Sequence, residues 1–272
     1  MKPFKTSNLL IKTFALLSLL SGSFVLLNQK EVKANCLDEF GSNPSSMTDS
    51  CEITPERYLI RVYEMGFCTT DPLAGSDFAG TSCTATFEST SGVEVDIAGT
   101  TADLVGSNTR PTPGTYNHAY IKMSNKFGLR GTYEMNDTTF CSTASGGSDS
   151  STGCSSVNFS ERLVDFSRGG TCNSDEGDQE FSVSLTFSTG VTGTMKAKLA
   201  NDSYVTSTSC GASTRLVGSF APSTPITISD NTLGLEVDFT VTNTGMTIVP
   251  NDGGTAIRSF GSGPFRPRFS SY

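Results

Sequence analysis

Residues 232–241, TLGLEVDFTV, alternate between polar and apolar side chains along their whole length. Leu, Val or Phe stands at every second position from Leu233 to Val241, with Gly, Glu, Asp and Thr between them. Side chains of a β-strand point alternately to the two faces of its sheet. The segment therefore predicts a strand with one buried and one solvent-exposed face.

The same alternation recurs along the chain, with Gly, Ser, Asn and Pro between the runs. Residues 181–187 predict a strand, residues 188–190 a turn, and residues 191–199 its hairpin partner. Residues 57–65 are partly apolar on both faces, which is typical of a central strand. Further strands are predicted at residues 84–88, 93–97, 116–123, 127–135, 214–220 and 246–249, with a turn at residues 251–254.

These patterns predict an all-β fold, a disulfide-tied antiparallel β-sandwich built as one unit or as two lobes. A lobe boundary would lie in the Ser/Gly-rich loop 142–157. Residues 92–97 and 234–239 share a short pattern that would suit a duplication, although generic strand alternation also produces such matches.

The first 34 residues have the pattern of an export signal. Lys2, Lys5 and Lys12 form a basic start, residues 14–27 are apolar apart from Ser and Gly, and residues 32–34 are Val-Lys-Ala. The apolar run is shorter than the roughly 20 residues of a membrane-spanning helix. We expect a signal peptide at residues 1–34 and a secreted β-rich domain at residues 35–272, with an uncleaved anchor as the alternative.

The predicted mature chain is acidic. Residues 1–34 hold five of the 19 basic and one of the 27 acidic residues, which leaves 14 basic against 26 acidic, a net charge of −12. Such a charge disfavours nucleic acid and anionic membranes as partners. We expect a secreted or cell-surface protein with no transmembrane segment in the mature chain, or a periplasmic one if the host is Gram-negative and exports it no further.

Eight cysteines all follow the signal, with no C-x-x-C pair, and the chain has one histidine. This favours disulfides over a zinc site. Spacing suggests local pairs, although sequence alone leaves many connectivities open. The suggested pairs are Cys36 with Cys51, Cys68 with Cys83, Cys141 with Cys154, and Cys172 with Cys210.

Two predicted strands each carry a Glu and an Asp two residues apart, Glu94 with Asp96 and Glu236 with Asp238. Paired carboxylates serve as acid and base in glycosidases. A solvated polar strand face gives the same pattern, and no Gly-x-Ser-x-Gly motif accompanies them. We expect no catalytic residues, and a secreted hydrolase is the least favoured alternative.

Strand geometry would place Tyr116, His118, Tyr120 and Lys122 on one face. Aromatic side chains on such a face could stack on a glycan or contact a partner protein. A row of ordinary cross-strand pairs is the alternative.

Residues 173–180, NSDEGDQE, are rich in oxygen ligands but lack the EF-hand spacing. A solvated acidic loop is favoured over a calcium site, so we expect no metal and no cofactor. Formal glycosylation sequons begin at Asn136, Asn158 and Asn201.

The last ten residues are basic and aromatic on an otherwise acidic chain. They could form an assembly tail that docks on another subunit, or an arm that folds back on its own domain. The residues concerned are Phe265, Arg266, Arg268, Phe269 and Tyr272.

These observations favour a non-catalytic exported structural or adhesive protein of the cell surface or an extracellular assembly. Its expected partner is protein, through self-association or a surface partner. A carbohydrate or small-ligand binding module that uses Tyr116, His118 and Tyr120 is the main alternative.

Overall fold

The computed structural model describes residues 35–99, 104–166, 180–186, 192–207, 211–232 and 235–271, all within the unit Glu31–Tyr272. Of residues 180–181, 183–186, 235–238 and 266–271 it describes the backbone only. The predicted signal peptide lies outside the described residues. No helix in the described ranges is long and apolar enough to cross a membrane.

Strands dominate the described chain, which confirms the all-β fold, and the strands of each sheet pair antiparallel. The helical elements are α1 (Cys36–Glu39) and the 3₁₀ turn Gly80–Ser82. The first ten strands are β1 (Cys51–Ile53), β2 (Arg57–Cys68), β3 (Cys83–Asp96), β4 (Ser107–Asn108), β5 (Gly114–Tyr116), β6 (His118–Ser124), β7 (Lys126–Arg130), β8 (Thr132–Met135), β9 (Thr138–Ser142) and β10 (Ser148–Asp149). The others are β11 (Phe159–Arg162), β12 (Glu180–Thr186), β13 (Thr192–Ala200), β14 (Arg215–Pro222), β15 (Ile226–Ile228), β16 (Leu235–Thr240), β17 (Met246–Pro250), β18 (Ile257–Ser262) and β19 (Arg266–Ser271).

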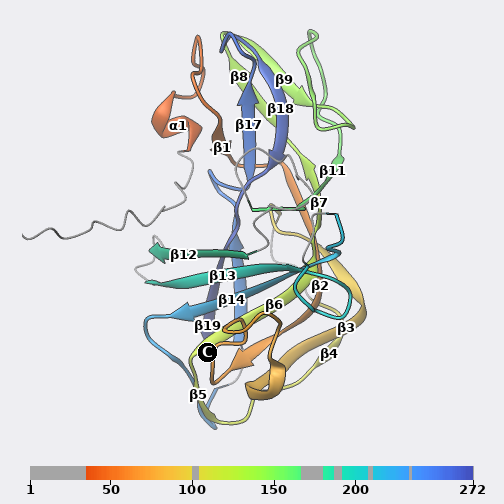
Figure 1. Cartoon of the computed structure of the whole chain (residues 1–272). Coiled ribbons are helices and arrows are strands. Elements are labelled where there is room, and N and C mark those ends of the chain that lie inside the picture. Colours follow the sequence, from red (N-terminus) through yellow and green to blue (C-terminus); the bar gives the residue numbers. More distant parts are fainter. Residues whose placement is uncertain are drawn as a thin grey trace, which may run out of the picture. The chain divides into compact units, whose positions relative to one another are not determined.

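One sheet of nine strands forms the frame of the fold, in the order β11-β7-β2-β6-β14-β13-β12, with β3 paired to β2 and β4 paired to β3. Figure 1 shows β12, β13 and β14 lying side by side in it. Because β2 is long, it pairs with β3, β6 and β7 at different points along its length. This confirms the central strand predicted from residues 57–65, and β12 and β13 confirm the predicted hairpin partners.

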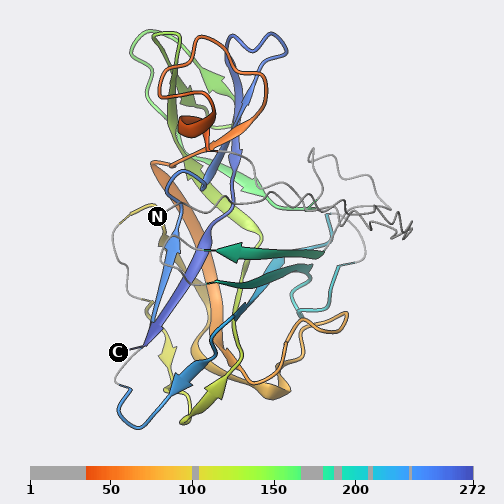
Figure 2. The same cartoon turned by 90° about the vertical axis from the view of Figure 1, so that its left-hand side faces the viewer.

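Four smaller sheets complete the unit: β1-β17-β18, β8-β9-β10, β5-β15 and β16-β19. Figure 2 shows the β16-β19 ribbon running beside the large sheet. The decisive alternating segment of the sequence forms β16, and its partner β19 comes from the C-terminal segment.

A continuous apolar core joins the large sheet to the smaller ones, and it includes Tyr58, Met123, Leu199 and Ile248. Phe265, which precedes β19, packs its ring against Tyr58 at 5.8 Å between ring centroids. The same ring lies 5.6 Å from Phe239 of β16 and 6.2 Å from Phe127 of β7. Phe265 therefore anchors the ribbon to the core, because buried aromatic contacts contribute both area and favourable ring geometry.

Three of the four suggested disulfides are confirmed: Cys36–Cys51, Cys68–Cys83 and Cys141–Cys154. Each closes a segment with a sequence separation of 13 or 15 residues. Cys172 and Cys210 lie outside the described residues. Local pairing is thus the rule wherever the structure describes the cysteines.

Some predicted strands have different limits. Residues 84–88 and 93–97 contribute to one strand, β3, in which Gly92 has φ +73° and the register against β2 shifts between Val62 and Glu64. Residues 127–135 divide at Gly131 into β7 and β8, where the Gly131 N–H donates to the side-chain hydroxyl of Ser142 instead of to a backbone carbonyl. The alternation of polar and apolar residues does not by itself reveal such bends, because a β-bulge inserts a residue without changing the kinds of residue found in the strand.

Candidate functional site

A row of register partners crosses β6, β14 and β13 of the large sheet. Lys122, Val217 and Lys198 are register partners on these three strands. Their chain neighbours, such as Leu199, point into the core, so this row lies on the opposite face, which we call the outer face. Lys196 lies two residues before Lys198 on β13 and shares that face. Three lysines thus lie on the outer face of an acidic protein.

Residues 69–82 form a flap over the outer face. Cys68 and Cys83 are register partners at the ends of β2 and β3, and their disulfide closes the flap at its base. Within the flap, the Asp71 carboxylate accepts a hydrogen bond from the Leu73 N–H at 2.9 Å, which stabilises a local turn. The disulfide at the base of the flap restricts the conformational freedom of a segment that has few apolar residues of its own.

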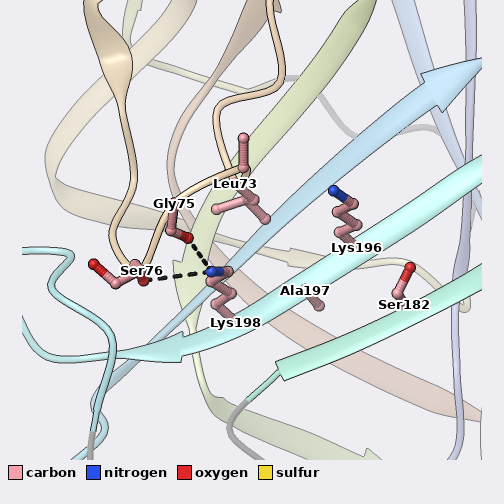
Figure 3. Close-up of a pocket in the computed structure, with 8 residues that line it drawn as sticks. Leu73, Gly75, Ser76, Ser182, Lys196, Ala197 and Lys198 are labelled. Atoms are coloured by element: carbon pink, nitrogen blue, oxygen red, sulfur yellow. Dashed lines mark hydrogen bonds between the residues drawn. The ribbon is translucent and has the colours of Figure 1, made fainter.

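Hydrogen bonds and ring contacts attach the flap to β13 and β6. Lys196 Nζ donates to Asp71 Oδ2 at 2.6 Å, and Lys198 Nζ donates to the Ser76 carbonyl at 3.4 Å and to the Gly75 carbonyl. The ring of Phe78 packs 5.1 Å from the ring of Tyr120. Figure 3 shows Lys196 and Lys198 rising from β13 toward the flap.

Lys122 forms a largely buried ion pair on the outer face. Its Nζ donates to Glu64 Oε2 at 2.8 Å, and Tyr120 Oη donates to Glu64 Oε1 at 2.6 Å. The ammonium also lies 4.2 Å from the centroid of the Phe78 ring and 4.5 Å from that of the Tyr204 ring. The lysine thus connects two strands, the flap and the segment around Tyr204, with aromatic faces supplying part of its stabilisation.

The environment sets the charges of this face. Burial alone raises the pKa of Asp71, but the hydrogen bonds from Lys196 and from the Leu73 N–H outweigh it and keep that pKa below its usual range. Burial lowers the pKa of His118, Lys196 lowers it further, and Asp71 opposes them. At neutral pH, Asp71 is therefore ionised and His118 is uncharged. Burial, with the Glu64 carboxylate, raises the pKa of the Tyr120 hydroxyl, which stays protonated as the donor to Glu64.

The predicted ligand face of Tyr116, His118, Tyr120 and Lys122 requires a correction. Tyr116, Tyr120 and Lys122 are only 4%, 2% and 7% exposed. Strand β5 ends at Tyr116, and β6 begins at His118. Tyr116 packs with Phe67 in a small cluster that also includes Ala119, whereas Tyr120 and Lys122 contact Glu64. The flap covers this side of β6, so the four residues do not form an exposed aromatic surface.

The carboxylates considered for hydrolysis lie on different sheets. Glu94 lies 3.2 Å from Arg61, and Asp96 accepts hydrogen bonds from the Tyr58 and Ala98 N–H groups. These contacts fasten the end of β3 against β2. Glu236 and Asp238 lie in β16, opposite Ser270 and Arg268 in the register of the ribbon. No contact of the described residues brings the two pairs together.

The C-terminal segment folds back on its own domain. This is the second of the two possibilities that the sequence raised for it, the first being an assembly tail. Arg266, Arg268 and Phe269 lie in β19, paired with β16, and the partly buried Phe265 packs against the core. Tyr272 lies outside the described residues. If this segment takes part in assembly, it would therefore do so through the edge of β19 that faces away from β16, while β16 remains its intramolecular partner.

The predicted acidic loop, residues 173–180, lies outside the described residues except for Glu180 at the start of β12. In the ranges that the structure describes, no group of three or more His, Cys, Asp or Glu side chains is arranged to hold a metal ion.

Comparison with known protein families, with characterised proteins and with solved structures found no significant match. The fold and the outer face themselves define the class: an all-β, disulfide-tied antiparallel protein with a flap held over a row of lysines.

Proposed function

We propose that the chain is a non-catalytic exported structural or adhesive protein, displayed at the cell surface or polymerised into an extracellular assembly. The observation that carries this proposal is the set of three disulfides, each closing a local segment at the end of a strand. Disulfides persist in oxidising compartments outside the cytosol. Disulfides also stabilise a β-protein against unfolding, and this stabilisation does not depend on catalytic residues.

Open strand edges offer a route to assembly. β12 is the last strand of the large sheet, and among the described residues no strand pairs with its outer side. The unpaired N–H and C=O groups of such an edge are a template for a strand from another molecule. The outer edges of the β16-β19 ribbon offer the same chemistry, so self-association through strand addition is the mode that the fold supports best.

Charge on the β12 edge tests this mode. We expect Ser184→Lys in β12 to reduce the assembled fraction at least several-fold in light scattering, because natural edge strands use lysine to block pairing. Ser150→Lys, in an exposed loop, is the matched control and should assemble like the unaltered protein. Equal assembly of the two variants would rule out the β12 edge as the joint.

Small-ligand binding is a second proposal, favoured by a cavity beside the flap. Because Tyr116 and Tyr120 are buried, this function would use a different surface from the aromatic face predicted from the sequence.

A further inference from the structure

A cavity of about 500 Å³ lies between the flap and the last two strands of the large sheet. Flap residues 73–76 line one side of it, and Ser182 of β12 lines the other together with Lys196 and Lys198 of β13. Ser182 and Lys196 are register partners, so their side chains stand on the same face of the sheet, as Figure 3 shows. The volume falls within the range of small-molecule pockets.

Both lysines of the cavity already have partners within the chain. Lys196 Nζ lies 2.6 Å from Asp71 Oδ2, so the carboxylate balances the charge of this lysine. Lys198 is 5% exposed, and its ammonium group donates to the carbonyls of Gly75 and Ser76. Neither lysine therefore requires a ligand that carries a negative charge, and an uncharged ligand avoids the cost of removing an ion from water.

The walls combine hydrogen-bond donors and acceptors that have further capacity. An ammonium group has three donors, and the ion pair uses one of those of Lys196. A backbone carbonyl can accept two hydrogen bonds, and that of Gly75 accepts one from β13. The exposed Ser182 hydroxyl can both donate and accept. Leu73 and Ala74 add apolar atoms to the lining, so the cavity offers mixed polar and apolar surface without an excess of either.

We propose that this cavity binds a neutral, polyhydroxylated ligand such as a hexose. Each hydroxyl of a sugar both donates and accepts, so its hydroxyls suit the Lys196 ammonium group, the Ser182 hydroxyl and a flap carbonyl. The C–H groups of the sugar ring suit the Ala74 side chain. This inference deepens the small-ligand proposal above and rests on it, because it names the class of ligand for that cavity.

Amide NMR of the oxidised protein, purified from an exporting host, tests the class of ligand. D-glucose, D-galactose and D-mannose are titrated separately, and at least one of them should shift the amide signals of Gly75, Ser76 and Ser182. D-glucuronate and D-glucosamine carry one charge of either sign on a similar ring, and neither should bind more tightly than D-glucose. Raising sodium chloride from roughly 50 mM to roughly 500 mM should change the dissociation constant of the hexose less than about twofold, because salt screens only interactions between charges.

Ser182→Ala is the informative variant, because it removes one hydroxyl from the cavity and no charge. We expect the dissociation constant of the hexose to rise about fivefold, which is typical of losing one neutral hydrogen bond. Ser160→Ala, at an exposed position of β11, is the matched control and should bind like the unaltered protein. Unchanged amide signals outside the cavity would show that both variants are folded.

The possible failures of the two proposals differ. Tighter binding of D-glucuronate or D-glucosamine than of D-glucose would overturn the neutral class of ligand and leave the small-ligand proposal standing. Equal affinity of Ser182→Ala and Ser160→Ala would show that the hexose binds outside this cavity, and the inference would be wrong. No shift with any of the five compounds would contradict the inference and the small-ligand proposal together.

Discussion

Lys122→Met should lower the free energy of unfolding by about 3 kcal/mol, because it leaves the Glu64 carboxylate without its ammonium partner in a mostly buried position. The Lys122 side chain is 9% exposed and that of Glu64 is 21% exposed. The substitution also removes the charge that lies close to the rings of Phe78 and Tyr204. Equilibrium unfolding in urea, followed by circular dichroism, measures the change.

A second substitution separates the lost ion pair from the lost packing. In Glu64→Gln/Lys122→Met the amide oxygen can still accept the Tyr120 hydrogen bond, and the unpaired charge is gone. This double variant should be more stable than Lys122→Met alone. Arg61→Met, which breaks the exposed Arg61–Glu94 pair between β2 and β3, should cost less than about 1 kcal/mol. A loss in Lys122→Met no greater than in Arg61→Met would contradict the role assigned to this pair.

Cys68→Ala/Cys83→Ala should also destabilise the protein by about 3 kcal/mol, the value expected for opening a loop of this length. The loss has a local signature, because this disulfide closes the base of the flap. Amide hydrogen exchange at residues 74–78 should become faster than in the unaltered protein, with a larger increase than in the strands of the large sheet.

Cys141→Ala/Cys154→Ala is the matched control for that experiment, since it opens a loop of similar length in another sheet. Its stability should fall by a similar amount, while hydrogen exchange in the flap should stay unchanged. If both double variants affected the flap equally, the flap would depend on global stability alone, and the Cys68–Cys83 bond would not be what holds it.

The sequence predicted the strands well because strand formation leaves a local signal. Alternation located β16, β12 and β13, and short spacing suggested the Cys141–Cys154 pair. The same signal could have indicated that Lys196 and Lys198 share a face, because they are two residues apart in a predicted strand.

The outer face could not be predicted, because its contacts join distant parts of the chain. Asp71 and Lys196 are 125 residues apart, and Tyr120 and Glu64 are 56 residues apart. The sequence gives no sign that the flap folds over β6, and that contact is the reason Tyr120 is buried instead of exposed. The misassigned ligand face therefore reflects missing tertiary information at Tyr120 and Lys122, and a strand boundary between Tyr116 and His118 that the sequence did not reveal.

Negative-stain electron microscopy of residues 35–272, purified in oxidised form from an exporting host, tests the proposed structural role most directly. We expect ordered filaments, tubes or sheets, with strand edges as the joints. A uniform population of monomers at high protein concentration would contradict it and would leave ligand binding at the lysine-lined cavity as the better explanation of what the protein does.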